Sequence, residues 1–283
     1  MNDTQQTPAR RSNWVLITTS IVGGAVLLGA IASAAIAGVY MAARGSNSAS
    51  GSGSGDRAIT ADVRDLDELD IDAGSADFSV VYDGEGGADT ALLVVSGGTR
   101  EWTMRRDEGA LEIDSSRGFF LDWLTFGPDF GQTVVLHLPE QLRDRQMDAD
   151  LDLSSGSLRV AGVFGELNVE VSSGEAVVAG SARSVDAHLS SGGLEFELAD
   201  VTEADLEVSS GVMRGELTGE APRRAELSVS SGSIDLILPD VPYDLRSSVS
   251  SGSADNLLRT DPSASRTLDV RVSSGSVMLR PGS

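Results

Sequence analysis

Apolar and polar residues alternate along most of the chain from residue 58 to the C-terminus. The alternation is organised around the triplet Ser-Ser-Gly, which occurs seven times at intervals of 18 to 23 residues. A repeat of this length is typical of solenoid proteins, in which each repeat packs only against its neighbours. The triplets end at Gly156, Gly174, Gly192, Gly211, Gly232, Gly252 and Gly275.

The positions before each triplet separate into an inward set and an outward set, because side chains two apart in a strand point to the same face. Three positions before the glycine stand Leu153, Val171, Leu189, Val208, Val229, Val249 and Val272, and five before it stand Leu151, Val169, Ala187, Leu206, Leu227, Ser247 and Val270. The position between them holds Asp152, Glu170, His188, Glu207, Ser228, Ser248 and Arg271. The mostly aliphatic set predicts a core face, and the polar set predicts a solvent face.

A second strand is expected after each triplet, because the inward set resumes two positions past the glycine. It holds Leu158, Ala176, Leu194, Met213, Ile234, Ala254 and Val277. Rungs of two short strands cannot close a core alone, but parallel stacking about 4.8 Å apart buries a continuous one. The predicted fold class is therefore all-β, a parallel β-solenoid or β-helix-like repeat domain. Residues 69–80 fit the same columns as an eighth, degenerate rung, and alternating runs at 92–98, 111–116 and 133–139 predict further strands.

The Ser-Ser-Gly corners are expected to be structural. A serine beside a glycine resembles a nucleophile elbow, but no histidine is repeated with the triplets. The second serine has the parity of the core, so stacked hydroxyls are expected to form a hydrogen-bonded ladder. Glycine is expected at the corner because it accommodates a bend or bulge at least cost.

An uncharged apolar stretch from Trp14 to Ala43 predicts one transmembrane helix over residues 14–43, since about 20 apolar residues cross a bilayer. Arg10 and Arg11 precede the stretch, whereas only Arg44 follows closely. The positive-inside rule then makes residues 1–13 a short cytoplasmic tail. Residues 44–57 are a Gly/Ser-rich flexible linker, and 58–283 form an extracytoplasmic β-strand-repeat domain. The expected location is the cell membrane, single-pass.

A cleaved signal peptide is the competing interpretation of this stretch. Ala32-Ser33-Ala34 has the small-x-small form of a cleavage site. The apolar residues continue past this site to Tyr40, although the apolar region of a signal peptide normally runs only about 7 to 15 residues. The length of the stretch therefore favours an uncleaved anchor.

Composition excludes several kinds of site. The net charge of −22 argues against nucleic acid as a partner, since phosphate binding needs a basic face. The chain has no cysteine and two histidines, so a zinc site would depend on His137, His188 and carboxylates. Acidic runs at 65–72 and 148–152 alternate with apolar residues, which indicates solvent faces of strands and not calcium loops. No catalytic, cofactor-binding or metal-binding residue is predicted.

The stacking register gives one local prediction. With rungs in register, His188 lies between Glu170 and Glu207 on the solvent face. Two neighbouring anions favour the imidazolium form, so the pKa of His188 is expected to be raised.

The least repeat-like segment runs from Gly118 to Phe130 and is rich in aromatic residues. An exposed aromatic cluster would mark a partner-binding patch. The alternative is a hydrophobic latch packed over the side or end of the solenoid, where such folds need protection. The patch would consist of Phe119, Phe120, Trp123, Phe126 and Phe130.

Several motifs together resemble the bacterial "putative adhesin" family of β-strand-repeat domains of unknown function. They are the strand runs ending in Leu138-Pro139 and Leu238-Pro239, the Ser-Gly repeats that follow, and the opening segment Glu68–Asp77. The resemblance covers residues 58–283. It implies a parallel β-helix-like fold on the cell envelope with adhesion as a conjectured role, and it supplies no catalytic residues.

The function predicted is that of a non-catalytic, membrane-anchored envelope domain acting as an adhesin-like binding, scaffold or sensory module. Its partners would be the membrane and an envelope protein or cell-wall polymer. A body of about ten rungs plus the linker reaches about 70 Å from the bilayer, which favours a membrane-proximal role. The alternative is a carbohydrate-active enzyme on a β-helix scaffold, which needs a carboxylate pair or a basic residue converging in a cleft. An aromatic groove lined by Trp102, Trp123 and an acid pair would support it.

Overall fold

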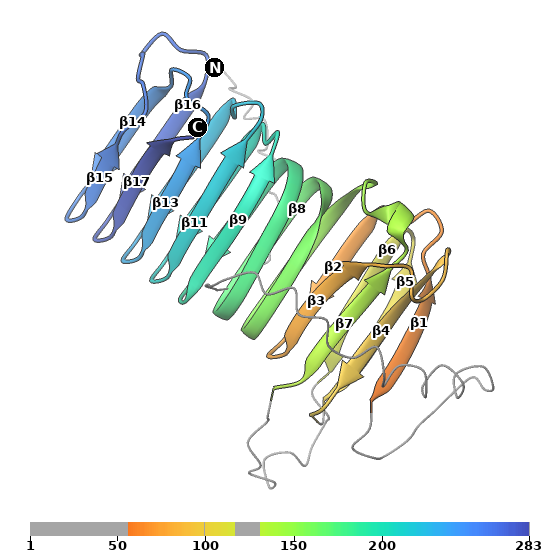
Figure 1. Cartoon of the computed structure of the whole chain (residues 1–283). Coiled ribbons are helices and arrows are strands. Elements are labelled where there is room, and N and C mark those ends of the chain that lie inside the picture. Colours follow the sequence, from red (N-terminus) through yellow and green to blue (C-terminus); the bar gives the residue numbers. More distant parts are fainter. Residues whose placement is uncertain (1–55, 99, 117–130, 283) are drawn as a thin grey trace, which may run out of the picture.

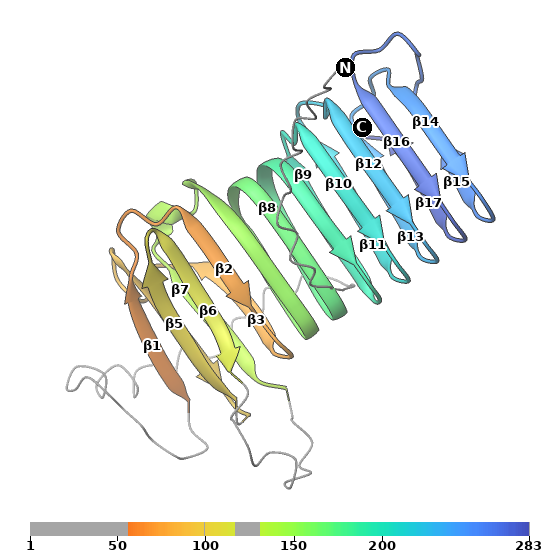
Figure 2. The same cartoon turned by 180° about the vertical axis from the view of Figure 1, so that it is seen from behind.

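The chain folds into a long stack of β-rungs in which two sheets face each other (Figures 1 and 2). The computed structural model describes residues 56–98, 100–116 and 131–282. The strands are β1 (Arg57–Asp62), β2 (Glu68–Asp72), β3 (Asp77–Tyr82), β4 (Thr90–Ser96), β5 (Glu101–Asp107), β6 (Ala110–Ser116), β7 (Thr133–Leu138), β8 (Gln146–Leu189), β9 (Gly193–Ala199), β10 (Glu203–Val208), β11 (Val212–Thr218), β12 (Arg224–Val229), β13 (Ser233–Leu238), β14 (Asp244–Val249), β15 (Ser253–Asn256), β16 (Thr267–Val272) and β17 (Ser276–Pro281), with a 3-10 helix at Glu140–Leu142.

Each rung contributes one strand to each sheet. In the first sheet β6, β2, β8, β10, β12, β16 and β14 pair in parallel, and in the second sheet β7, β3, β8, β9, β11, β13, β17 and β15 do so. β8 is a single 44-residue strand that belongs to both sheets, because several corners interrupt its direction without interrupting its pairing. The predicted all-β fold is confirmed, and most of its strand pairs are parallel as expected.

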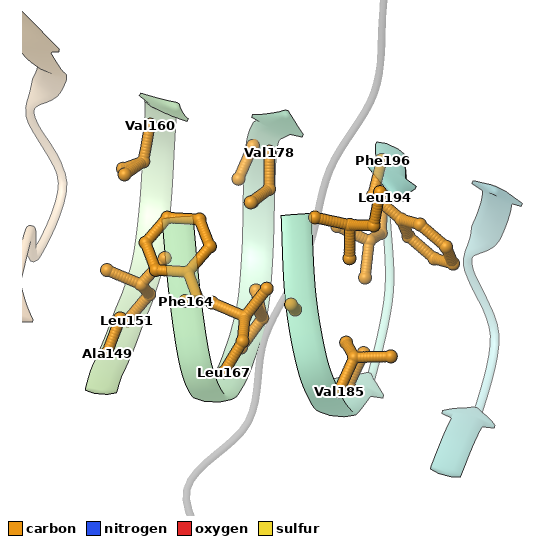
Figure 3. Close-up of a cluster of buried hydrophobic side chains, with 14 of the residues drawn as sticks. Ala149, Leu151, Val160, Phe164, Leu167, Val178, Val185, Leu194 and Phe196 are labelled. Carbon is orange, nitrogen blue, oxygen red and sulfur yellow. The ribbon is translucent and has the colours of Figure 1, made fainter. Parts of the chain in front are cut away.

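The predicted inward columns form the core between the two sheets. Figure 3 shows equivalent side chains of successive rungs in rows, such as Val160 with Val178 and Leu167 with Val185. All residues of the three columns are buried except those of the sixth triplet, Ser247, Val249 and Ala254. The degenerate eighth rung is confirmed as β2–β3, which packs directly on the first pass of β8.

The order of the last two rungs differs from the order of the sequence. The rung β16–β17 lies against β12–β13, and the earlier rung β14–β15 forms the end of the stack (Figure 1). The physical reason is the composition of β14–β15, where the polar residues Ser247 and Asn256 stand in columns that hold no polar side chain in the other Ser-Ser-Gly rungs. A terminal repeat needs a more polar outer face; Ser247 is exposed there, although Val249 and Leu257 are also 42% and 64% exposed.

The other end of the stack departs from a purely parallel solenoid. The rung β6–β7 lies outside β2–β3, and three antiparallel strands follow it: β5 pairs with β6, β4 with β7, and β1 with β4. This corrects the expectation of parallel stacking throughout. A reversal of strand direction covers the edges of the last parallel rung, which would otherwise present unpaired backbone groups.

The predicted hydroxyl ladder is largely replaced by a backbone ladder. Most of the second serines are exposed, namely Ser173, Ser210, Ser231, Ser251 and Ser274, so the inward orientation expected from parity is wrong. The chain bends before this position, which breaks the alternation. Backbone N–H groups donate across rungs instead, as from Ser210 to the carbonyl of Ser190 at 2.7 Å, although the hydroxyls of Ser173 and Ser191 do lie 3.2 Å apart.

The glycine of each triplet is required mainly by close approach between rungs. A Cβ added to Gly232 would lie 2.3 Å from the carbonyl oxygen of Gly211, and one added to Gly275 would lie 2.2 Å from that of Gly232. Among the seven corner glycines only Gly156 and Gly192 have a positive φ, near 100°. The expected conformational role therefore applies at two corners, and steric exclusion by the neighbouring backbone applies along the stack.

None of the described residues forms a helix long and apolar enough to cross a membrane. The predicted span over residues 14–43 lies outside the described residues.

Replacing Gly232 with alanine is expected to destabilise the domain by about 1–3 kcal/mol, because the methyl group meets backbone that cannot rotate away. Gly282→Ala is the matched control, since its added methyl group finds nothing closer than 3.5 Å. The midpoint of urea unfolding followed by circular dichroism measures both. Equal midpoints for the two variants would contradict steric exclusion at the corner.

Candidate functional site

The predicted aromatic patch lies outside the described residues. Its members are Phe119, Phe120, Trp123, Phe126 and Phe130, within residues 117–130. The strands on either side of this stretch, β6 and β7, pair in parallel with β2 and β3 and so belong to one rung. Trp102 is 7% exposed; its indole N–H donates to Gln132 at 2.9 Å, and its ring packs on Phe78. Trp102 is therefore a core residue and lines no aromatic groove.

The outward side of the first sheet carries two adjacent columns of mostly acidic side chains, here called the acidic face. Strand register aligns these side chains across successive rungs. The first column contains Glu112, Asp70, Asp150, Asn168, Asp186, Asp205 and Glu226, and the second contains Asp114, Asp72, Asp152, Glu170, His188, Glu207 and Ser228. The stacking that aligns the core columns thus places like charges about 4.8 Å apart.

Arginines compensate the charge at the two ends of the acidic face. Arg105, on β5, contacts Glu112 at 2.9 Å and Asp114 at 3.0 Å. At the other end Glu226 is paired with Arg224 and, at 2.8 Å, with Arg271. Exposed ion pairs of this kind contribute little to stability, so their main effect is to limit the extent of the negative surface.

The carboxyl groups in the middle of the acidic face are perturbed. Partial burial, followed by the charges of neighbouring acids, raises the pKa of Asp152 to about 7 and that of Asp70 to about 6. The pKa values of Asp150 and Asp205 are also raised, again with burial as the largest cause. Each of these groups resists ionisation because its anion loses water contacts and gains a repulsive neighbour.

The predicted environment of His188 is confirmed. His188 lies opposite Glu207 in β10, with its Nδ1 atom 3.4 Å from a Glu207 oxygen, and its pKa is raised. The largest cause is Asp186, whose carboxylate lies 3.1 Å from Nε2, while Glu207 and Glu170 contribute less. Sequence columns identified the two anions in adjacent rungs but missed Asp186, two residues away on the same strand face.

Two open hollows lie on the described surface. One, of about 260 Å³, lies on the acidic face and includes Asp186, Asp205, Arg224 and Glu226. The other, of about 510 Å³, lies at the serine corners beside Ser173, Ser191 and Arg214. Because the carboxylates project side by side from a sheet, these surfaces suit contact with an extended or basic partner better than enclosure of a small molecule.

The two histidines are not brought together, so no single metal site can contain both of them. His188 belongs to the first sheet, whereas His137 lies on β7 in the second sheet and contacts Asp83. The contact of His137 with the loop after β3 was not predicted, since no repeat column links the two segments.

Replacing Asp152 with asparagine is expected to stabilise the domain at alkaline pH. The folded-state pKa of about 7 lies above the ordinary value of 3.8, so ionisation opposes folding fully above pH 7 and progressively less as the pH falls toward 4. Because the group is partly exposed, the expected gain at pH 8 is discounted to about 1 kcal/mol. Urea unfolding at pH 8 and pH 4 measures it, and a gain that is equal at both pH values would contradict this assignment.

Comparison with known families and structures places this geometry in context. The family model described as Toastrack DUF4097 matches residues 46–280. A comparison with curated proteins found no match.

Three solved structures are similar to the chain, and each covers 81% of it. They are a "putative cell adhesion protein" from Clostridium sporogenes ATCC 15579 (8% identity, 100% of that chain, TM-score 0.31), a "putative lipid binding protein" from Parabacteroides distasonis ATCC 8503 (16%, 97%, 0.43) and a "putative adhesin" from Bacteroides fragilis NCTC 9343 (12%, 98%, 0.41). The family match spans most of the sequence and includes all of the described strands except the last residue of β17. The chain therefore belongs to the Toastrack DUF4097 family of β-strand-repeat domains, whose function is not known.

Proposed function

We propose that the protein is a non-catalytic binding or scaffold module of the cell envelope, held outside the cytoplasm by an N-terminal membrane anchor. The observation that carries the proposal is the acidic face, a regular array of carboxylates along several rungs of one sheet. The array extends along the stack, so it suits a partner with a matching extended surface. The partner class proposed is an envelope protein with a basic surface.

The electrostatics of the face support a cationic partner. Asp70 and Asp152 have raised pKa values because burial and neighbouring anions penalise their charge. A basic side chain placed over them would relieve that repulsion and favour the ionised forms. An anionic wall polymer would instead be repelled by the net charge of the chain.

The geometry of the carboxylates favours binding over glycoside chemistry. Such chemistry uses two carboxyl groups on opposite sides of a scissile bond. Neighbouring acids such as Asp72 and Asp152 instead project from one sheet in the same direction. The burial of Trp102 also removes one of the two tryptophans of the aromatic groove that would have supported the enzyme hypothesis.

The anchor at residues 14–43 and the aromatic segment belong to the same proposal. An uncharged stretch of this length suits a single span, and the linker at 44–57 keeps the head close to the bilayer. Phe119, Phe120, Trp123, Phe126 and Phe130 are proposed as a second contact for a partner or for the membrane surface.

Topology is testable with introduced thiols, because the natural chain has no cysteine. In cells with an intact cytoplasmic membrane, a membrane-impermeant maleimide is expected to label Ser231→Cys in the full-length chain. Ser12→Cys, in the predicted cytoplasmic tail, is expected to react only after lysis. Labelling of Ser12→Cys in intact cells, or protection of Ser231→Cys, would overturn the proposed orientation.

The binding function is testable by in-cell cross-linking of the full-length chain. Neutralising Asp70, Asp72, Asp150 and Asp152 with asparagine is expected to weaken capture of the partner about tenfold, from several screened charge contacts. The matched control neutralises four acids on the second sheet, Glu175, Glu195, Glu197 and Glu216, with glutamine. Capture that is unchanged by the first variant, or equally reduced by the control, would count against the acidic face.

A further inference from the structure

The second histidine occupies an unusual position in the stack. On β7 the neighbours Leu136 and Leu138 point into the core, so His137 points out of the second sheet. Its side chain is nevertheless only 9% exposed. Asp83 and Glu85, in the loop between β3 and β4, lie against it. Core packing does not explain a histidine that points out of the sheet and is buried beside two acidic side chains.

Two carboxylates converge on one nitrogen of this imidazole. The Nδ1 atom lies 2.8 Å from an oxygen of Asp83 and 3.9 Å from an oxygen of Glu85. The three ligand atoms lie within 4.8 Å of one another. A tetrahedral Zn²⁺ holds oxygen and nitrogen ligands about 2.1 Å away, which separates the ligand atoms by about 3.4 Å. The observed distances bracket this separation, so small side-chain movements would complete the geometry.

The loop is held in place by its own hydrogen bonds. The backbone N–H of Glu85 donates to the second carboxylate oxygen of Asp83 at 3.1 Å, and that of Gly84 donates to the carbonyl of Leu138 on the histidine strand at 3.1 Å. Gly87 closes the turn by donating to Gly84 at 2.9 Å. The Asp83 carboxylate is thereby held beside His137 by the backbone, which reduces the entropy lost when an ion binds.

We propose that Asp83, Glu85 and His137 form a binding site for a divalent transition-metal ion, with Zn²⁺ as the preferred occupant. The ion would bind the lone pair of Nδ1 in the neutral imidazole tautomer that carries its one ring proton on Nε2. Imidazole with carboxylate suits zinc, whereas Ca²⁺ and Mg²⁺ prefer oxygen ligands alone. The carboxylate side chains are each 41% exposed, so the remaining coordination positions are open to water or to an oxygen atom of a partner.

His188 provides a natural contrast within the same chain. It too has two close carboxylates, but Asp186 faces Nε2 at 3.1 Å and Glu207 faces Nδ1 at 3.4 Å. These nitrogens lie on different sides of the ring, so one ion cannot bind the histidine and both acids. The site is thus distinguished by convergence on a single nitrogen and not by the presence of acids beside a histidine.

The experiment uses the full-length chain, titrated with ZnCl₂ and followed by isothermal calorimetry. One equivalent of Zn²⁺ is expected to bind, and the double variant Asp83→Asn, Glu85→Gln is expected to weaken this binding by at least about tenfold, as is His137→Gln. Glu195→Gln, Glu197→Gln removes two acids elsewhere, and His188→Gln removes the other histidine; both are expected to bind as the natural chain does. Circular dichroism verifies that each variant is folded.

A second readout locates the ion directly, because the chain has only two histidines. In a long-range ¹H–¹⁵N spectrum of the natural chain, Zn²⁺ is expected to shift the ring nitrogens of His137 and leave those of His188 unchanged. This test does not depend on whether His137→Gln folds. The proposal is overturned if millimolar Zn²⁺ shifts neither histidine, if it shifts His188 alone, or if the Asp83, Glu85 double variant binds Zn²⁺ as tightly as the natural chain.

Discussion

The rest of the structure depends on the parallel stacking of backbone on backbone at about 4.8 Å from one rung to the next. This spacing leaves no room for a side chain at the corners, where a Cβ on Gly252 would lie 1.9 Å from the carbonyl oxygen of Gly275. It also fixes the register, since the corners align the strands on both sides. Glycine corners and aliphatic columns are two consequences of one distance. Further rungs can therefore extend the core along the stack, while each sheet still contributes a single layer of side chains to it.

The same register that orders the core places like charges next to one another. Polar positions repeat with the rungs as regularly as apolar ones, so an acidic sequence produces acidic columns. The pKa of Asp152, raised to about 7, shows that the fold tolerates this at a cost in stability near neutral pH. A domain gains nothing in stability from such an arrangement. This cost in stability is consistent with a surface that binds a partner. The arginines at either end of the acidic face limit the negative surface to the middle rungs.

Periodicity predicted those features that a single rung and its neighbours determine. The core columns, the eighth rung at β2–β3 and the position of His188 between two acids all follow from counting in twos from the glycines. Where the chain bends and breaks strict alternation, counting positions no longer predicts which side chains face the core. Most of the second serines are exposed for that reason. The exchange of the last two rungs was missed although Ser247 was visible in an otherwise aliphatic column. The exchange depends on the ten-residue connection between β15 and β16, which returns the chain to the position between β12–β13 and β14–β15. No local pattern encodes that path.

Features that interrupt the repeat are concentrated toward the N-terminal rungs. β7 follows the aromatic segment in the sequence, carries His137 and pairs with the antiparallel strand β4. The acidic loop that contacts His137 connects β3 to that same strand. In a solenoid, a repeated residue is explained by stacking alone, because every rung needs it. A buried histidine facing two carboxylates is needed by no other rung. The irregular rungs thus carry the one-off side-chain cluster, while the regular rungs supply an extended charged surface.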